Sequence, residues 1–237
     1  MPLLFTFSEY SQISKSLCDL RVLKPGQFSI VRYDNQELHA SVESRVAGDH
    51  CFILGSITPP ECQMVSFLLL AHTLKKEGAT RVTGILPYLA YSREDKQKPG
   101  QSLATAWTGA FLKASGFDEI WTVDLYSEHD RKLFPLPLQS LPPCAVFGES
   151  LGRLALNGAS FVSPDQGAIA RCQAMQSAAG LKFRNLVYFE KHRNESGIVH
   201  HTPVGKVERR AVIVDDILDT GATLVSACEK LVAAGAQ

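Results

Sequence analysis

The chain has 237 residues, 45% hydrophobic and 20% charged, which is typical of a folded protein with a substantial core and excludes a disordered one. Its 24 basic and 24 acidic residues cancel, so no overall field favours nucleic acid or an anionic membrane as a partner. No apolar stretch is long enough to span a bilayer and the start lacks a secretion signal, so we expect a cytoplasmic protein with six reduced cysteines.

The first half of the chain predicts a parallel sheet. After a short opening strand and a polar, helical stretch, alternating apolar and polar residues from 28 to 44 predict exposed antiparallel strands. A repeating strand and helix pattern follows, with strands at 51–56, 81–88 and 119–124 and helices at 60–77 and 102–115. Such alternation is typical of α/β domains.

Four prolines between 135 and 148 interrupt this pattern and predict a crossing between domains. The pattern then resumes with helices at 148–157 and 168–179, strands at 159–165 and 185–193, and a last strand and helix after 210. We therefore predict two tandem, doubly wound α/β domains, 1–145 and 146–237. Nothing after Gly235 supplies a further strand, so we expect the second domain to be incomplete.

The stretch AVIVDDILDTGATL, residues 211–224, has the pattern of a binding loop. Its apolar start predicts a buried strand ending at Asp215 and Asp216, and a turn leads to a helix at about Ala222. Unpaired N–H groups at a helix start suit an anion, while two carboxylates suit vicinal hydroxyls or a cation. These features together predict a sugar phosphate. An ordinary capped helix after an acidic strand end is the simpler alternative.

Residues 212–223 resemble the phosphoribosyl-binding loop of type I phosphoribosyltransferases and of ribose-phosphate diphosphokinases. The resemblance implies the phosphoribosyltransferase fold in both domains. It assigns ribose 5-phosphate binding to residues of this loop: Asp215, Asp216, Asp219, Thr220, Gly221 and Thr223.

Further segments resemble the diphosphokinases alone. Residues 91–95, YSRED, resemble their nucleotide-binding pattern Tyr-x-Arg-Gln-Asp, which implies ATP binding by Arg93, Glu94 and Asp95. Residues 32–37 resemble a loop that completes the ATP site of a neighbouring subunit, which implies roles for Tyr33, Asn35 and Glu37 and a homo-oligomer. An exposed charged loop is the alternative for the first segment.

The segment FEKHR, 189–193, resembles the family's cationic segment and implies catalytic roles for Lys191 and Arg193. Because they lie two residues apart, an extended strand places them on one face. The polar stretch 194–207 resembles a mobile lid that brings these cations over the reacting phosphates. A solvated hairpin with a basic edge is the alternative.

The resemblance also implies a dependence on Mg²⁺. Asp165, in SPDQG, matches a magnesium-associated aspartate, although a turn-stabilising role is nearly as well supported. The chain departs from the family at Tyr126, which replaces a histidine near the diphosphate and metal, and a phenol is a poor substitute for imidazole. His129 could partly compensate as a ligand, or be an ordinary surface histidine.

The leading hypothesis is therefore a Mg²⁺-dependent ribose-phosphate diphosphokinase that converts ATP and ribose 5-phosphate to phosphoribosyl diphosphate and AMP for nucleotide biosynthesis. Two alternatives stay open. Tyr126 favours a catalytically impaired regulatory subunit, and the 212–223 loop alone is compatible with a phosphoribosyltransferase acting on a base.

Overall fold

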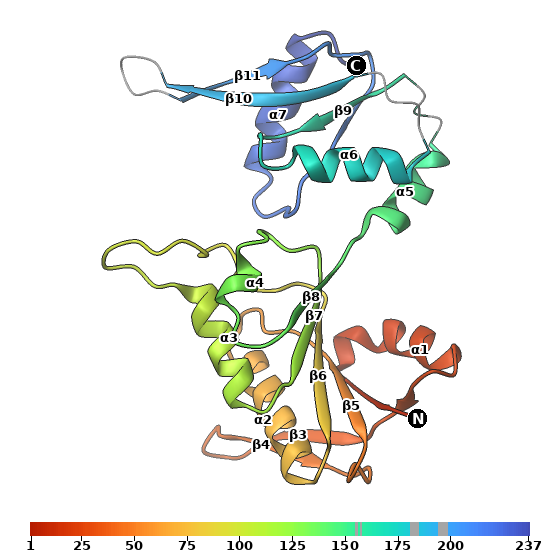
Figure 1. Ribbon diagram of the computed structural model, residues 1–237, viewed down its shortest axis with the longest axis vertical. Coiled ribbons are helices and arrows are strands. Elements are labelled where there is room, and N and C mark those ends of the chain that lie inside the picture. The colour runs from red at the N-terminus through yellow and green to blue at the C-terminus, as the bar shows by residue number, and fades with distance from the viewer. Residues whose placement is uncertain (155, 157, 181–184, 194–198) are drawn as a thin grey trace. The chain divides into compact units, whose positions relative to one another are not determined.

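The chain folds into two compact units, Met1–Leu141 and Pro142–Gln237. The structure, a computed structural model shown in Figure 1, describes residues 1–154, 156, 158–180, 185–193 and 199–237. The division falls slightly before the boundary at 145 and 146 that the sequence suggested.

The first unit is built on a six-stranded sheet in which every neighbouring pair of strands is parallel, in the order β2-β1-β5-β6-β7-β8. Its strands are β1 (Leu3–Thr6), β2 (Lys24–Pro25), β5 (His50–Leu54), β6 (Arg81–Leu86), β7 (Glu119–Val123) and β8 (Leu138–Leu141). Its helices are η1 (Ser8–Tyr10), α1 (Ser11–Asp19), α2 (Cys62–Lys76), α3 (Ala104–Ala114) and α4 (Asp130–Leu133). The predicted alternation of strand and helix is confirmed.

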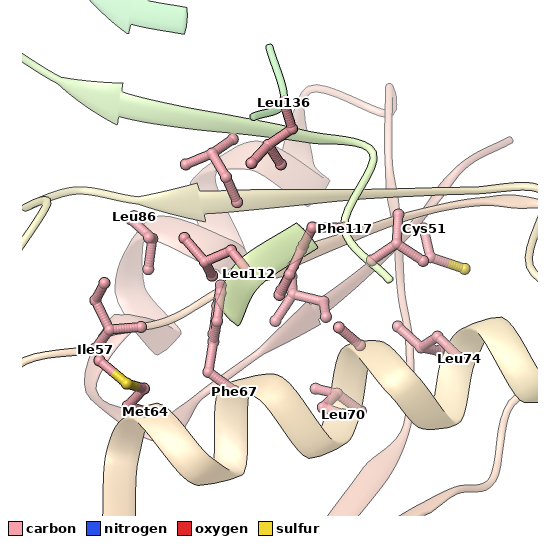
Figure 2. Packing of buried hydrophobic residues seen from close by; sticks show 14 of the residues in the cluster. Cys51, Ile57, Met64, Phe67, Leu70, Leu74, Leu86, Leu112, Phe117 and Leu136 are labelled. Atoms are coloured by element: carbon pink, nitrogen blue, oxygen red, sulfur yellow. The ribbon is translucent and has the colours of Figure 1, made fainter. Parts of the chain in front are cut away.

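Both faces of this sheet are covered, as alternating side chains on the central strand β5 show. Cys51 and Ile53 belong to the larger apolar cluster, which includes buried residues of α2 and is drawn in Figure 2. Phe52 and Leu54, which point to the opposite face, pack with partly buried residues of α1. A strand buried on both faces must be apolar throughout, which is why residues 51–54 form an uninterrupted apolar run.

Strands β3 (Phe28–Arg32) and β4 (Leu38–Val42) form a separate antiparallel hairpin, which confirms the pairing predicted from alternation. Phe28 anchors the hairpin to the unit, because its ring meets Phe5 and Phe7 edge-on at centroid distances of 6.1 and 5.2 Å. The hairpin loop, Tyr33–Glu37, therefore extends from a fixed base.

The boundary between the units, after Leu141, falls inside the predicted crossing at 135–148, but this stretch also contains a strand that the sequence did not predict. Residues Leu138–Leu141 form β8, an edge strand parallel to β7, with Ile120 opposite Leu138. Prolines flank this strand and do not interrupt it, and an edge position tolerates them. The helix expected at 148–157 is also misplaced, because α5 spans Cys144–Gly152. It starts directly after Pro143, and a proline is tolerated there because the first N–H groups of a helix have no acceptor within the helix.

The second unit has a four-stranded sheet in the order β11-β10-β9-β12, parallel except for the β10–β11 pair. Its elements are α5, β9 (Ser160–Ser163), α6 (Ile169–Ala178), β10 (Leu186–Arg193), β11 (Val199–Val204), β12 (Ala211–Ile213) and α7 (Ala222–Ala233). Phe161 packs in a cluster with residues of α5 and α6, and Val162 packs in another with residues of α7. Helices thus cover both faces, and the predicted α/β fold class with mainly parallel sheets is confirmed.

The β10–β11 hairpin is longer than the rest of this sheet (Figure 1). Only Leu186, Val187 and Tyr188 of β10 pair with β9, whereas Phe189–Arg193 pair with β11 alone. Residues 199–204 of the expected lid are therefore strand β11, and 194–198 lie outside the described residues. In the described part of the chain, no helix combines the length and the apolar character needed to cross a membrane.

Candidate functional site

The predicted sugar-phosphate loop lies where the second sheet's parallel strands end. Strand β12 pairs with β9, and the N–H of Val214 extends the pairing by donating to the carbonyl of Val162 at 2.9 Å. Asp215 and Asp216 follow directly, half-buried, and the N–H of Asp216 donates to Oδ1 of Asp215 at 2.9 Å. The two carboxylates are therefore fixed beside each other at the edge of the sheet.

Helix α7 starts at Ala222, the residue that the sequence indicated. Gly221 precedes it with φ +81°, the left-handed conformation that favours glycine, and the hydroxyl oxygen of Thr220 accepts a long hydrogen bond of 3.4 Å from the N–H of Ala222. The side chains of Asp219, Thr220 and Thr223 are exposed around this turn. Backbone N–H groups without helical acceptors and two hydroxyl groups thus surround the start of an α-helix, which suits a phosphate.

Asp165 belongs to the same edge, because it follows β9, the neighbour of β12. Its Oδ1 accepts a hydrogen bond from the N–H of Ala168 at 3.0 Å, and its carbonyl accepts one from the hydroxyl of Ser163 at 2.6 Å. The turn-stabilising role considered from the sequence is therefore present. A role in metal binding stays a prediction.

The three carboxylates influence one another. Burial is the largest cause that raises the pKa of Asp215, followed by its contact with Asp216, and the charge of Asp165 acts in the same direction. Carboxylates held this close favour a bound cation or hydroxyl donors, because either one would offset their mutual repulsion.

The predicted nucleotide segment of the first unit lies between β6 and α3. Arg93 and Glu94 are exposed, but Asp95 is only 5% exposed, so the alternative of a wholly solvated loop fails for that residue. The hydroxyl of Thr105, in the first turn of α3, donates to the carbonyl of Tyr91 at 3.2 Å. Tyr91 has φ +67°, an uncommon conformation for an aromatic residue that the surrounding contacts must maintain.

A pocket of about 700 Å³ opens between this segment and the start of α3. Sequence reasoning missed it, since its wall includes helix residues that no motif singles out. The lining residues are Tyr91, Arg93, Glu94, Ser102, Leu103, Ala104 and Trp107.

The loop after β7 carries Tyr126 and His129, both exposed. Behind them lies Asp130, a fully buried carboxyl group that the sequence did not reveal because EHDRK is typical of a solvated surface. Its Oδ2 accepts a hydrogen bond from the N–H of Ser127 at 3.3 Å, while Oδ1 has no hydrogen-bond partner among the described residues. Burial raises the pKa of Asp130 to about 6, with a contribution from Asp95.

The remaining predicted residues lie on two hairpins. Tyr33, Asn35 and Glu37 form the β3–β4 loop, where the N–H of Tyr33 donates to the carbonyl of Glu37 at 2.9 Å. Lys191 and Arg193 lie on β10, opposite His201 and Val199 of β11. His129 and Asp165 lie in different units, and no three His, Cys, Asp or Glu side chains among residues outside the gaps at 155, 157, 181–184 and 194–198 form a ready metal site.

Comparison with known proteins shows which proteins this chain is similar to. Residues 3–116 match the N-terminal domain of ribose phosphate pyrophosphokinase. The ribose-phosphate pyrophosphokinase of Campylobacter jejuni is 29% identical over 232 residues, or 95% of this chain and 72% of the relative. That of Ralstonia nicotianae is 25% identical over 240 residues, or 99% of this chain and 75% of the relative.

The fold also matches a solved structure. Phosphoribosylpyrophosphate synthetase from Mycobacterium smegmatis superposes with a TM-score of 0.86 at 24% identity, covering 100% of this chain and 78% of the other. The similar relatives extend over both units, and the fold agrees throughout. Over both units, the chain is therefore similar to ribose-phosphate pyrophosphokinases.

Proposed function

We propose that this chain is a ribose-phosphate diphosphokinase, which transfers the diphosphoryl group of ATP to the anomeric hydroxyl of ribose 5-phosphate and releases AMP. The observation that carries the proposal is the loop after β12, where paired carboxylates lie close in sequence to the start of helix α7 behind Gly221. This combination suits a molecule that carries both vicinal hydroxyls and a phosphate. The pyrophosphokinase relatives match over both units, which supports the same assignment.

The loop residues divide by chemistry. Thr220, Gly221 and Thr223 surround the start of α7, so their hydroxyl and N–H groups suit the 5-phosphate. Asp215 and Asp216 are acceptors, which suit the ribose hydroxyls. Asp219 completes the proposed sugar-phosphate site.

ATP is assigned to the first unit and to a second copy of the chain. Arg93 offers a planar set of donors suited to phosphates, and Glu94 and Asp95 accompany it at the pocket between β6 and α3. Tyr33, Asn35 and Glu37, on the β3–β4 loop, would serve the ATP site of a neighbouring subunit. The proposal therefore includes a homo-oligomer, working in the cytoplasm.

Lys191 and Arg193 are the proposed catalytic residues. They occupy alternate positions on β10, beyond the part of the strand that pairs with β9. Two cations at this spacing can neutralise charge that builds on the transferred diphosphoryl group, and positioning and electrostatics supply most of the catalysis in phosphoryl transfer.

The proposed cofactor is Mg²⁺, with Asp165 and His129 as protein ligands. The raised pKa of Asp215 beside Asp216 and Asp165 fits a cation in the second unit, since a cation would relieve the repulsion. Mg²⁺ uses one or two carboxylates together with substrate phosphates and water, so a complete protein cage is not needed. When bound, the ion would neutralise phosphate charge.

The test is formation of AMP from ATP in the presence of ribose 5-phosphate and Mg²⁺. We expect AMP to appear only when both substrates are present, and Lys191→Ala to abolish it while both substrates still bind. If the folded protein binds both substrates and forms no AMP, the proposal is wrong.

Tyr126 favours a second candidate function, that of a regulatory subunit which binds the substrates but does not transfer the diphosphoryl group. This side chain is 41% exposed in the loop after β7, where the family resemblance places a histidine. A large gain of activity in Tyr126→His over an almost inactive parent would support this candidate. A good parent rate that the substitution does not improve would exclude it.

A further inference from the structure

Three buried side-chain oxygen atoms of the first unit have no hydrogen-bond partner among the described residues. They are Oδ1 of Asp130, Oγ1 of Thr108 and Oγ1 of Thr122. All three side chains are shielded from solvent, with exposed fractions of 0%, 1% and 1%. Buried polar atoms are almost always paired in native structures, because a buried polar atom without a partner is destabilising. Three such atoms on neighbouring elements therefore indicate that something binds between them.

Helix α4 lies against the first half of α3, which brings two of these side chains near each other. A Cβ added at Gly109 of α3 would lie 3.1 Å from Cγ of Phe134, the residue that follows α4. The N–H of Phe134 donates to the carbonyl of Asp130 at 3.1 Å, so Asp130 begins the turn that lies against α3. Thr108 directly precedes Gly109 and is buried, and we therefore place its hydroxyl beside this turn.

The third oxygen comes from the sheet that the two helices cover. Side chains alternate along a strand, so Thr122 of β7 points to the same face as Ile120. Ile120 is part of the apolar cluster that also contains Leu112 of α3 and Phe134. Because Thr122 lies two residues beyond Ile120, toward the loop that leads to α4, its hydroxyl faces the layer in which Asp130 lies.

A second carboxyl group, that of Asp95, borders this layer and is only 5% exposed. It lies close to α3, because the carbonyl of the preceding residue, Glu94, accepts a hydrogen bond from the N–H of Thr105 at 3.4 Å. Burial is the main cause that raises the pKa of Asp130, and the charge of Asp95 adds to it, so the two carboxyl groups are neighbours. In the described part of the chain, no Lys, Arg or His side chain forms an ion pair with either of them.

The side-chain atoms around this region are hard oxygen ligands, which suit an alkali or alkaline-earth ion. A water molecule between the hydroxyl groups would leave two buried carboxylates without a compensating charge. Mg²⁺ is a poor fit, because it keeps several water molecules and needs near-octahedral geometry, whereas these side chains come from four separate segments. Protein oxygen atoms can replace the hydration shell of a monovalent ion, so Na⁺ or K⁺ fits a dry, irregular site better.

We propose that the carboxylates of Asp95 and Asp130 and the hydroxyl oxygens of Thr108 and Thr122 form a binding site for a monovalent cation, Na⁺ or K⁺, inside the first unit. The ion would join the segment after β6 to α3 and to the loop after β7. The inference goes beyond the proposed function and does not depend on it, because binding of the ion stabilises the fold without any transfer reaction.

The first experiment follows thermal unfolding of the full chain without Mg²⁺, in mixtures of NaCl or KCl with tetramethylammonium chloride at constant ionic strength. Both tryptophans, Trp107 and Trp121, belong to the first unit, so their fluorescence reports on its unfolding. We expect Na⁺ or K⁺ to raise the melting temperature by about 2–6 °C in a saturable manner, because the ion binds only the folded chain. The ion with the lower half-saturating concentration is the preferred ligand. Equal melting temperatures in all mixtures would overturn the proposal.

The second experiment repeats this titration with variants of the proposed ligands. Thr122→Val keeps the shape of the side chain and removes its hydroxyl, so the half-saturating concentration should rise about tenfold. In tetramethylammonium chloride alone its melting temperature should not fall, because the hydroxyl has no partner there. The matched control is Thr73→Val on α2, where the lost hydroxyl bonds only to the carbonyl of Leu69, and it should respond to the ion like the parent. A parent-like response in Thr122→Val would remove this residue from the site.

A proton held by Asp130 is the competing explanation, and Asp130→Asn separates it from a bound cation. The cation site predicts that this variant loses the response to Na⁺ and K⁺, so that it melts below the parent only when the ion is present. A protonated carboxyl group predicts that Asp130→Asn and the parent differ by the same amount in every salt. That result, or an unchanged ion response in both Asp130→Asn and Thr122→Val, would refute the site.

Discussion

The imidazole Nε2 of His50 lies 2.9 Å from the hydroxyl oxygen of Thr83, which is fully buried on the neighbouring strand β6. The ring of His50 also packs on Phe52 at a centroid distance of 4.3 Å. Burial, and then the positive charge of Arg81, lower the pKa of His50. The folded chain therefore holds this imidazole in its neutral form at pH values where the unfolded chain would already bind a proton.

This difference predicts a loss of stability in mild acid. The contribution of His50 is fully present above its unfolded pKa of about 6.5 and is lost as pH falls through the lower folded value. The melting temperature should fall less between pH 8 and pH 5 in His50→Asn than in the parent. His72→Asn, at an exposed position of α2, is the control and should follow the parent. If the melting temperature falls by the same amount with pH in all three proteins, the prediction is wrong.

Replacing Thr223 or Asp216 with alanine should weaken ribose 5-phosphate binding while leaving the fold almost unchanged. Neither side chain belongs to an apolar cluster, so its removal takes away a ligand contact and opens no core cavity. A hydrogen bond to a charged group contributes about 1.5–3 kcal/mol, which corresponds to at least a tenfold loss of affinity. Calorimetry and thermal melting separate the two effects, with Ser226→Ala as a control one turn along α7. Unchanged affinity with a large fall in melting temperature would assign these residues to structure alone.

Gly221→Ala should strain the loop at the start of α7. An added Cβ would meet only Leu218, at 3.9 Å, so the cost comes from the left-handed backbone and is about 1–2 kcal/mol. Gly235→Ala, at φ +106° beyond the other end of the same helix, imposes similar strain away from the loop. Urea unfolding should show comparable destabilisation of the two variants, but only Gly221→Ala should lose affinity for ribose 5-phosphate. Equal affinities would mean that the loop does not bind this ligand.

The contact between α5 and α6 predicts a large difference between two glycines of one helix. A Cβ at Gly148 would lie 2.5 Å from the backbone carbonyl carbon of Ala178, whereas one at Gly152 would approach nothing closer than 3.3 Å. Gly148→Ala must push the helices apart and should cost about 1–3 kcal/mol in the free energy of unfolding. Gly152→Ala should cost much less. Equal unfolding midpoints in urea would show that this contact adapts freely.

The proposed ATP site shared between subunits predicts complementation between two inactive variants. Tyr33→Ala removes a ring from the β3–β4 loop, and Arg93→Ala removes a donor from the β6–α3 segment. If the two residues serve one site from different subunits, each variant alone should be inactive, but a mixed oligomer contains some intact sites and should recover part of the rate of AMP formation. A double variant carrying both substitutions on one chain, mixed with either single variant, is the control and should recover less. A fully active monomer in sedimentation would contradict the shared site.

Much of the fold follows from periodicity. The alternation in 28–44 predicted the β3–β4 hairpin, and the apolar strand before Asp215 with Gly221 beyond it predicted the start of α7. These signals are local. Alternation places one set of side chains on the buried face of a hairpin, and the backbone conformation of a turn restricts which residues can occupy it. Strand β8 was missed because no local pattern indicates it. The prolines on both sides indicate an interruption of regular structure, and Leu138 is a buried strand residue only because β8 pairs with β7.

Residues of the candidate site that belong to a sequence motif could be predicted, whereas residues that are distinguished only by their burial could not. The positions of Asp215 and Asp216 at the end of a parallel strand follow from the sequence. Asp130 could not be found in this way, because a carboxylate within a run of charged residues is expected to be solvated, and its burial depends on packing against distant segments. Trp107 was equally hidden, since an aromatic residue on an amphipathic helix usually belongs to the core.

The unequal lengths of the strands around β10 affect how the second unit opens. Tyr188 pairs with strands on both sides, β9 and β11, whereas Lys191 and Arg193 belong to a two-stranded ribbon. Breaking only the pairs beyond Glu190 would leave Phe189 in its apolar cluster and β9 and β12 joined, so we expect the end of the ribbon to open as a separate cooperative unit with a low free energy of opening. Amide hydrogens at 191 and 193 should therefore exchange with solvent well before that of Tyr188. The proposed catalytic cations can then move without unfolding the loop that is proposed to bind the sugar phosphate.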